Sequence, residues 1–267
     1  MSEFTEKRGA GESPAAPDLI IGRNAVSEAL RAGRAIDRIQ IAKGQRTGSI
    51  LPLIAKARDR GIPVKESDVR KLDALAGPHH QGIVAFAACR EYASLDDLFA
   101  EADRRGEPPF FVVCDEIEDP HNLGAIIRTA ECAGAHGVIV PKRRNAGLSL
   151  TVEKASAGAV EHLPIARVTN ITETLRELKK RNVWVFGLDM NGSSWEQTDL
   201  SGAVALVVGS EGRGLSRLVR EECDGIVSLP MYGQIQSLNA SVACGILLYE
   251  VARRRHREQN GNGEGCE

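Results

Sequence analysis

From Phe110 onward, short apolar segments alternate with segments of helical periodicity. The apolar segments are rich in Val, Ile and Phe, as is typical of strands buried on both faces of a sheet. Strands that alternate with helices in this way predict an α/β fold, with a parallel sheet covered by helices on both faces. Strands are expected at 110–114, 137–140, 183–187, 203–208 and 225–229, and a long final helix from about 238 to 255.

A smaller α/β alternation precedes it, at residues 19–88. Its expected elements are a helix capped by Asn24 and ended by Gly33, a strand at 37–42, a helix at 50–60, a strand at 62–64, a short helix capped by Ser67 or Asp68, and a strand at 82–88. The acidic segment 91–109 contains a possible helix at 95–102 and ends in a Pro-Pro pair, which marks a boundary. We therefore expect a leader at 1–17, domains at 18–90 and 110–257 joined by a linker at 91–109, and a loose tail from 258.

The net charge of −2 conceals an asymmetry along the chain. Residues 18–90 carry 13 Lys and Arg against 7 Asp and Glu, whereas residues 91–109 carry 2 against 6. A basic domain on a nearly neutral protein favours a polyanionic partner, although scattered surface charge would equally well serve solubility. Charge alone leaves the two interpretations open.

The sequence contains no pattern typical of a metal, disulfide or membrane protein. The six cysteines are scattered without a C-x-x-C pair, which favours reduced thiols in a cytoplasmic protein. His79 and His80 have no third ligand at metal spacing, so a structural role or a contact with the polyanionic partner is favoured over a metal. No apolar run reaches the length needed to span a membrane.

Three strand–loop–helix junctions in the second half carry polar residues. The first, at 119–130 (DPHNLGAIIRTA), offers Asp119 or Asn122 as a helix cap and places Arg128 on the helix. Arg128 could be an ordinary solvated side chain. However, a turn and a helix with one cation at the carboxyl edge of a sheet also form a natural anion site.

The second junction is the glycine-rich loop at 207–216 (VVGSEGRGLS). It lacks the G-x-G-x-x-G order of a dinucleotide site and the Lys-Ser/Thr ending of a P-loop. Its central Glu211 would repel a pyrophosphate but suits a cationic ligand or an arginine partner.

The third junction, at 229–243 (LPMYGQIQSLNASVA), leads into the final helix, and Ser237 and Asn239 compete as its cap. Capping explains either residue alone. It does not explain three such junctions, and ligands gather where the carboxyl ends of parallel strands meet.

These three segments resemble the signature motifs of the SPOUT methyltransferases, in particular the TrmH-type branch that methylates ribose 2′-oxygens. The resemblance extends from Phe110 to about Arg255 and includes the stretch 154–159 (KASAGA). In the front domain, 22–30 (GRNAVSEAL) and 80–83 (HQGI) resemble the substrate-binding domain of RlmB-like enzymes, which methylate a guanosine of 23S ribosomal RNA. The matching residues of the three motifs are Asn122, Gly124, Arg128 and Thr129; Gly209, Glu211, Gly212 and Gly214; and Pro230, Met231, Gly233, Ser237, Leu238, Asn239 and Ser241.

The resemblance implies a trefoil-knotted fold, S-adenosylmethionine as cofactor, a homodimer with the site near its interface, and a front domain similar to a small RNA-binding ribosomal protein. It assigns cofactor contacts to Gly209, Leu229, Met231 and Leu238, and catalytic roles to Arg128, Asn122, Glu211, Ser237 and Asn239. Because aromatic residues make up only 4% of the chain, we expect RNA contacts through phosphate and shape rather than base stacking. The expected RNA contacts are Arg23, Arg31, Arg34, Arg38 and Arg46.

The resemblance gives Arg128 the central place in methyl transfer to the 2′-hydroxyl, as a general base or as a clamp on an RNA phosphate. Arginine almost never loses its proton in proteins, so the clamp is the physically cheaper role. The alternatives within the family are a transfer RNA guanosine or a resistance-type ribosomal site as target. Outside it, they are a non-catalytic RNA-binding protein and a dinucleotide-dependent enzyme.

Overall fold

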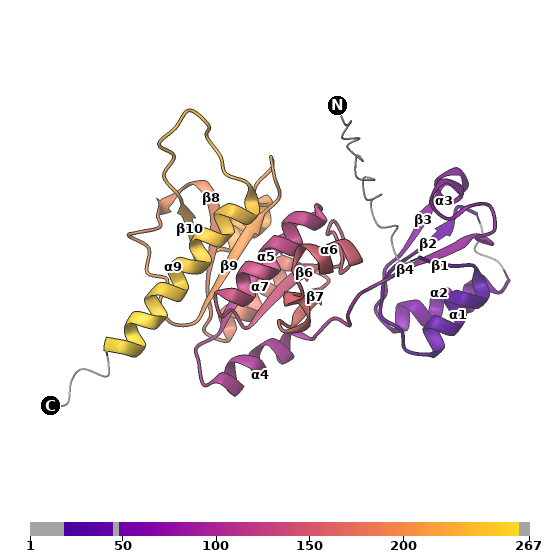
Figure 1. Ribbon diagram of the computed structural model, residues 1–267, viewed down its shortest axis with the longest axis horizontal. Coiled ribbons are helices and arrows are strands. Elements are labelled where there is room, and N and C mark those ends of the chain that lie inside the picture. The colour runs from indigo at the N-terminus through magenta and orange to yellow at the C-terminus, as the bar shows by residue number, and fades with distance from the viewer. Residues whose placement is uncertain (1–18, 45–47, 262–267) are drawn as a thin grey trace, which may run out of the picture.

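The computed structural model describes residues 19–44 and 48–261, which form two lobes joined by one connecting segment (Figure 1). The predicted leader, Arg46 and most of the predicted tail lie outside the described residues. The elements of the N-terminal lobe are β1 Leu19–Ile21, α1 Arg23–Arg31, β2 Ile36–Ala42, α2 Ile50–Asp59, β3 Val64–Ser67, α3 Val69–Ala76 and β4 Ile83–Ala87.

The N-terminal lobe is a mixed four-stranded sheet in the order β1-β4-β2-β3. Strand β4 pairs antiparallel with β1 and β2, and β2 pairs parallel with β3. Apolar side chains of α1 and α2 pack on one face of this sheet, and Leu72 of α3 packs on the other. The lobe therefore has its own core on both sides of a small sheet.

The C-terminal lobe is built on a six-stranded, all-parallel sheet in the order β10-β8-β9-β5-β6-β7. This confirms the predicted α/β class. Its strands are β5 Phe110–Asp115, β6 Gly137–Pro141, β7 Ile165–Val168, β8 Trp184–Ser194, β9 Val204–Gly209 and β10 Gly225–Ser228. Its helices are α4 Leu95–Arg105, α5 Pro120–Cys132, α6 Leu150–Ala155, the 3₁₀ turn η1 Ala159–Glu161, α7 Ile171–Lys180, α8 Arg217–Glu222 and α9 Ala240–Gly261.

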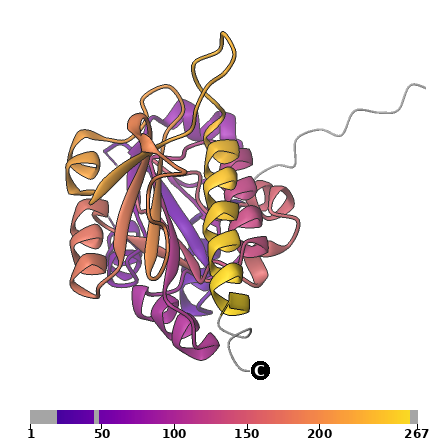
Figure 2. The same ribbon diagram turned by 90° about the vertical axis from the view of Figure 1, so that its left-hand side faces the viewer.

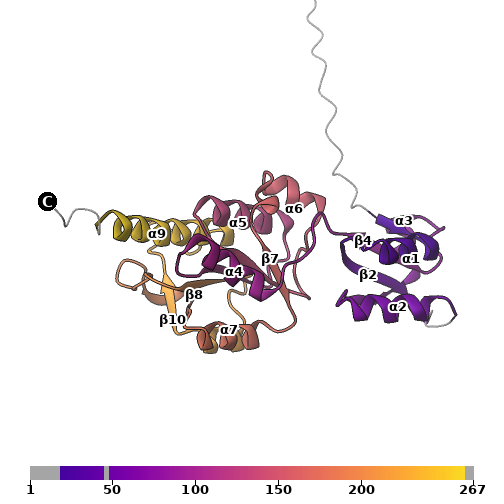
Figure 3. The same cartoon turned by 90° about the horizontal axis from the view of Figure 1, so that it is seen from below.

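Helices cover both faces of this sheet. Helices α5, α6 and α9 share one apolar cluster with alternate residues of β5, β6 and β9, while α4, α7 and α8 share another with the intervening residues. Figure 3 shows α5, α6 and α9 on one side and α7 on the other, and Figure 2 shows α9 running along the sheet. The side chains on both faces of the central strands are thus buried away from water, which explains why these strands are uniformly apolar.

Several local predictions were wrong for identifiable reasons. Helix α1 is capped by Gly22 without a side-chain hydrogen bond, so Asn24 lies inside the helix. Strand β3 begins at Val64 rather than at residue 62, because Pro63 has no N–H to donate to a ladder. The pattern missed the short strands β1 and β7, and the final helix begins at Ala240. Of the alternative caps, Asp68 caps α3, Asp119 caps α5 and Asn239 caps α9.

His136 stabilises the end of the C-terminal sheet at which β5 and β6 begin, opposite to the end that carries the motif loops. Its fully buried ring accepts a hydrogen bond from the Phe110 N–H at Nδ1 and donates from Nε2 to Glu107, at 3.0 and 3.2 Å. Burial, together with the nearby positive charges of Arg105 and Arg255, lowers the pKa of His136 from 6.5 to about 4. The neutral ring is therefore the form that the folded protein holds.

We predict that this histidine makes the protein less stable as the pH falls from 6.5 to 4. Between these values the unfolded chain binds a proton that folded His136 does not, so protonation favours unfolding, by about 3 kcal/mol at most. In His136→Asn the amide oxygen can still accept from Phe110, and the pH dependence of the free energy of unfolding should become flatter over this range. Urea titrations at pH 7, 6, 5 and 4 test this, and parallel curves for the two proteins would contradict it.

Candidate active site

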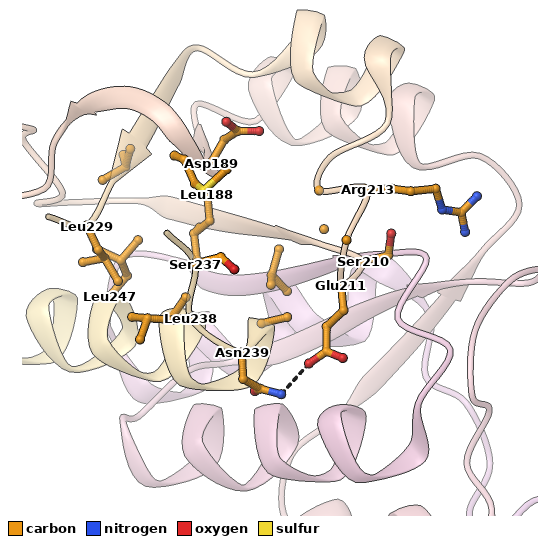
Figure 4. Close-up of a pocket in the computed structure, with 18 of the residues that line it drawn as sticks. Leu188, Asp189, Ser210, Glu211, Arg213, Leu229, Ser237, Leu238, Asn239 and Leu247 are labelled. Carbon is orange, nitrogen blue, oxygen red and sulfur yellow. Dashed lines mark hydrogen bonds between the residues drawn. The ribbon is translucent and has the colours of Figure 1, made fainter. Parts of the chain in front are cut away.

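The carboxyl ends of β5, β8, β9 and β10 meet at one edge of the sheet, and a cavity of about 540 Å³ lies there (Figure 4). Three chain segments line most of it: residues 188–191 after the first part of β8, residues 208–214 after β9, and residues 227–240 between β10 and α9. Ala243 and Leu247 of α9 form its apolar floor together with Val208 and Leu229. The parallel sheet therefore brings the second and third motifs to a single cavity.

The glycine-rich loop closes tightly on itself at this cavity. Ser210 and Gly214 exchange two backbone hydrogen bonds, of 3.1 and 2.9 Å, across the loop. A Cβ on Gly209 would lie 2.2 to 2.4 Å from backbone atoms of Gly214 and Leu215, a distance that real atoms do not adopt. Gly212 and Gly214 have φ values of +81° and +65°. The closed loop thus requires glycine at position 209 because of the close approach, and favours it at positions 212 and 214 because of the positive φ.

The side-chain amide of Asn239 connects all three motifs. Its Nδ2 donates to Asn122 Oδ1 at 2.9 Å and also to Glu211 Oε1, a contact drawn in Figure 4. Its Oδ1 accepts from the Ser241 and Val242 N–H groups and so caps α9. Asn122, at the start of α5, is 7% exposed, which makes its bond to Asn239 costly to lose. Three of the five predicted catalytic residues therefore form one cluster.

The other two, Ser237 and Arg128, make no hydrogen bond with this cluster. Ser237 lines the cavity with the cofactor residues predicted from the sequence: Gly209, Leu229, Met231 and Leu238. Arg128 lies on the exposed face of α5, less than two turns beyond Asn122, and does not line the cavity. Asn122 and Glu211 contact Asn239 rather than Arg128.

The sequence analysis missed the contribution of β8. Leu188, Asp189 and Asn191 line the cavity, and Asp189 pairs with Arg220 at 2.5 Å. The expected strand ended at Gly187, so these residues follow its carboxyl end, where the rule used for the three motifs predicts a ligand contact. Applying that rule to every strand would have found them.

The five predicted RNA contacts differ in their surroundings. Arg23 bonds to Gln81 and Ser49 and lines a second cavity, of about 700 Å³, in the N-terminal lobe. Arg31 is exposed and pairs with Glu28, whereas Arg38 pairs with Asp37 and stacks on Phe86. Arg34 is also exposed, and Arg46 lies outside the described residues.

The histidines and cysteines do not form a metal centre in the part of the chain that the structure describes. No group of three metal-ligating side chains occurs among residues 19–44 and 48–261, and His80 bonds to Asp73 and to the Gly82 N–H. The described cysteines are all unpaired, and burial raises the pKa of Cys244 to about 12. No helix within these residues is long and apolar enough to cross a membrane.

Two family models match the two lobes. Residues 109–249 match the SpoU rRNA Methylase family, and residues 19–93 match the RNA 2′-O ribose methyltransferase substrate-binding family. The chain belongs to the SpoU rRNA methylase family. It is a TrmH/SpoU-type RNA 2′-O-ribose methyltransferase, as the resemblance of its motifs implied.

Two of the known relatives of this SpoU-family enzyme extend over both lobes, and a third covers a smaller part of the chain. A putative TrmH family tRNA/rRNA methyltransferase of Bacillus subtilis, YacO, is 48% identical over 90% of this chain and 96% of its own. The SpoU methyltransferase AviRb of Streptomyces viridochromogenes, solved with AdoMet, is 28% identical, with a TM-score of 0.56, over 91% of this chain and 92% of its own. The TrmH/SpoU tRNA modifying enzyme of A. aeolicus is 30% identical, with a TM-score of 0.51, but covers only 61% of this chain and 86% of its own.

S-adenosylmethionine is the cofactor of this SpoU-family methyltransferase. The cavity suits it, because leucine and valine side chains in the lining offer apolar contact to an adenine ring and the carboxylates of Glu211 and Asp189 in the lining suit its positive charges. The missing G-x-G-x-x-G order is also consistent, since the cofactor has no pyrophosphate.

We predict that Gly209→Ala weakens S-adenosylmethionine binding by about 100-fold or more, because the new methyl group forces the 210–214 loop open. Gly233→Ala is the matched control, since its Cβ meets nothing within 4 Å in the loop between β10 and α9. Isothermal titration calorimetry on the three proteins gives the comparison. Equal dissociation constants for Gly209→Ala and the wild type would show that the closed loop does not hold the cofactor.

Proposed function

We propose that this enzyme methylates the ribose 2′-hydroxyl of a guanosine in 23S ribosomal RNA, in the cytoplasm. The observation that carries the proposal is the complete N-terminal lobe, which matches a substrate-binding family over 19–93. The relative described as tRNA modifying aligns with too little of this chain to span both lobes. A lobe of this size beyond the methyltransferase unit favours a large, folded RNA as substrate.

In this proposal the front domain, 18–90, binds RNA and the domain 110–257 transfers the methyl group, with 91–109 linking them. Arg23, Arg31, Arg34, Arg38 and Arg46 contact phosphates. The support is the surplus of basic residues in 18–90 and the exposure of Arg31 and Arg34. Phosphate contacts of this kind position an RNA without reading its bases.

The cofactor contacts in this proposal are Gly209, Leu229, Met231 and Leu238, which line the cavity, with the loops around them threaded as a trefoil knot. S-adenosylmethionine supplies a methyl group carried on a positively charged sulfur. Asn239 holds Glu211 and Asn122 in fixed positions, and Ser237 at the cavity mouth contacts the ribose.

Arg128 clamps the RNA phosphate next to the target ribose. Its guanidinium makes no hydrogen bond or ion pair with another described residue, and its helix, α5, also carries Asn122 of the motif cluster. A planar, permanently charged fork suits a phosphate better than it suits proton abstraction. The 2′-hydroxyl proton then passes to solvent or to the phosphate that Arg128 holds.

A homodimer completes the proposal. On α9 the side chains of Val242, Ile246 and Tyr249 are 50%, 37% and 55% exposed and lie on one face of the helix. A Cβ on Gly245 of this helix would lie 3.3 Å from the methyl of Thr129, which adjoins Arg128 on α5. An apolar face of this kind beside Arg128 would place the dimer interface near the substrate.

Mapping of ribose 2′-O-methylation in total RNA from cells with and without the gene tests the target. The expected result is the loss of one mark at a guanosine of 23S ribosomal RNA, restored by the intact gene but not by an Asn239→Ala variant. Loss of a mark in transfer RNA would replace the proposed target by the tRNA alternative. No lost mark in any RNA would contradict the proposed function.

We predict that Arg128→Lys lowers kcat/KM for RNA by about 100-fold, because an ammonium cannot form the forked contact with a phosphate. The dissociation constant for S-adenosylmethionine should stay unchanged, since Arg128 does not line the cofactor cavity. Arg217→Lys, at an exposed arginine that pairs with Glu221 on α8, is the control. A turnover of Arg128→Lys close to that of the wild type would contradict the clamp role.

A further inference from the structure

The buried carboxylate of Asp37 lies where the N-terminal lobe meets the C-terminal lobe. Asp37 is on β2, and its side chain is 12% exposed. Its Oδ1 accepts a hydrogen bond from the Tyr92 hydroxyl at 2.8 Å, and its Oδ2 accepts from Arg38 at 2.9 Å. Arg167 of β7 donates to its main-chain oxygen at 2.7 Å and lies 3.4 Å from Oδ1. Asp37 thus accepts hydrogen bonds from its own lobe, from the connecting segment and from the C-terminal sheet.

Tyr92 and Arg167 extend this contact into the C-terminal lobe. The Tyr92 hydroxyl accepts from the Leu148 N–H at 3.1 Å, and the Arg167 guanidinium stacks 4.0 Å from the centre of the Tyr92 ring. Burial, with the negative charge of Asp37, raises the pKa of Tyr92 far above its usual range, so its hydroxyl remains a donor. Each polar group in this cluster has a partner, which is the condition for a buried network to hold one geometry.

Gly147 brings the two lobes into close contact at the same point. Its φ is +70°, and a Cβ there would lie 2.4 to 2.5 Å from the Asp37 carboxylate. The connecting segment adds backbone bonds, from Cys89 N–H to Leu148 and from Ala93 N–H to Ile165, at 2.8 and 2.9 Å. The ribbons of the two lobes are joined by one connecting segment in Figures 1 and 3, and the Asp37 cluster lies where that segment meets both of them.

The loop that contacts Asp37 leads directly to the active-site cluster. Residues 147 and 148 precede α6, and Ala155 at the end of α6 packs against Gly124 of α5 so closely that a Cβ on Gly124 would lie 2.4 Å away. Helix α5 carries Asn122, which bonds to Asn239 at the cavity. Short, rigid contacts therefore connect the interlobe cluster to the residues beside the cofactor.

We propose that Asp37, with Tyr92 and Arg167, is a positioning cluster that fixes the RNA-binding lobe at one angle to the methyl-transfer cavity. The inference rests on the proposed function, because it concerns how the lobe that binds RNA is placed relative to the cavity where the methyl group is transferred. A fixed angle selects the ribose that arrives at the cavity among many that are chemically equivalent. The phosphate contacts of the N-terminal lobe alone cannot make that selection, since they do not read sequence.

The variants Asp37→Asn and Tyr92→Phe separate this role from folding. The first keeps the size of the side chain but removes the charge that Arg38 and Arg167 face, and the second removes one hydroxyl and keeps the ring on which Arg167 stacks. Arg181→Gln is the matched control, because Arg181 also pairs with a carboxylate, Asp96 at 2.6 Å, and stacks on an aromatic ring, Phe99, but within the C-terminal lobe.

Small-angle X-ray scattering of the full-length proteins measures the arrangement of the lobes without RNA. Both variants should show a broader distance distribution and a larger maximum dimension than the wild type, and Arg181→Gln should not. With a 23S ribosomal RNA transcript as probe, both should lose about tenfold in kcat/KM, chiefly through KM, and should also methylate additional riboses. The S-adenosylmethionine dissociation constant should stay within about twofold of the wild type.

The two proposals fail in different ways. A wild-type enzyme that leaves the transcript unmodified counts against the 23S target, and the scattering comparison still decides the role of Asp37. Scattering curves of Asp37→Asn and Tyr92→Phe that superimpose on the wild-type curve would overturn the positioning role. Broadened curves with unchanged KM and an unchanged methylation site would overturn it equally, since a loose joint would then not affect the reaction.

Discussion

The Asn239 amide holds the active site together, because among the described residues it is the one side chain whose hydrogen bonds join all three motif segments. It caps α9 through its oxygen and, through its nitrogen, binds Asn122 of the first motif and Glu211 of the second. These segments are far apart in sequence and meet only because β5, β9 and β10 belong to one parallel sheet whose carboxyl ends point the same way. The cavity beside them depends on this geometry, since its walls are the loops that Asn239 ties.

A rigid cavity does not by itself determine which ribose is modified. The enzyme must place one ribose hydroxyl of its RNA substrate within reach of the cavity, although the other riboses of that RNA are chemically equivalent. The lobes meet at a buried carboxylate, a tyrosine and an arginine, and within residues 19–44 and 48–261 their apolar clusters are separate. Polar networks of this kind contribute little net stability but strongly favour one geometry, which is what substrate positioning requires.

The sequence was sufficient to predict the central strands and two of the three segments that line the cavity, but not the β8 segment. Buried parallel strands are uniformly apolar, and Gly and polar residues at their carboxyl ends identify the ligand site. The short strand β7 was missed because Arg167, whose side chain bonds to Asp37, interrupts its apolar pattern. Long-range partners of this kind leave no periodic signal in one sequence. Six residues on an α-helix make about one and two-thirds turns, so Arg128 and Asn122 lie on different faces of α5. The position of Arg128 away from Asn122 could therefore have been predicted from the sequence.

Hydrogen–deuterium exchange with and without S-adenosylmethionine tests most directly whether the cavity that Asn239 organises is the cofactor site. Another cavity, in the N-terminal lobe and lined by Arg23, Asn24 and Gln81, serves as an internal comparison. The cofactor should slow exchange in residues 208–214 and 229–243 and leave residues 22–27 and 78–83 unchanged. Protection confined to the N-terminal lobe, or absent from the 208–214 loop, would contradict the account.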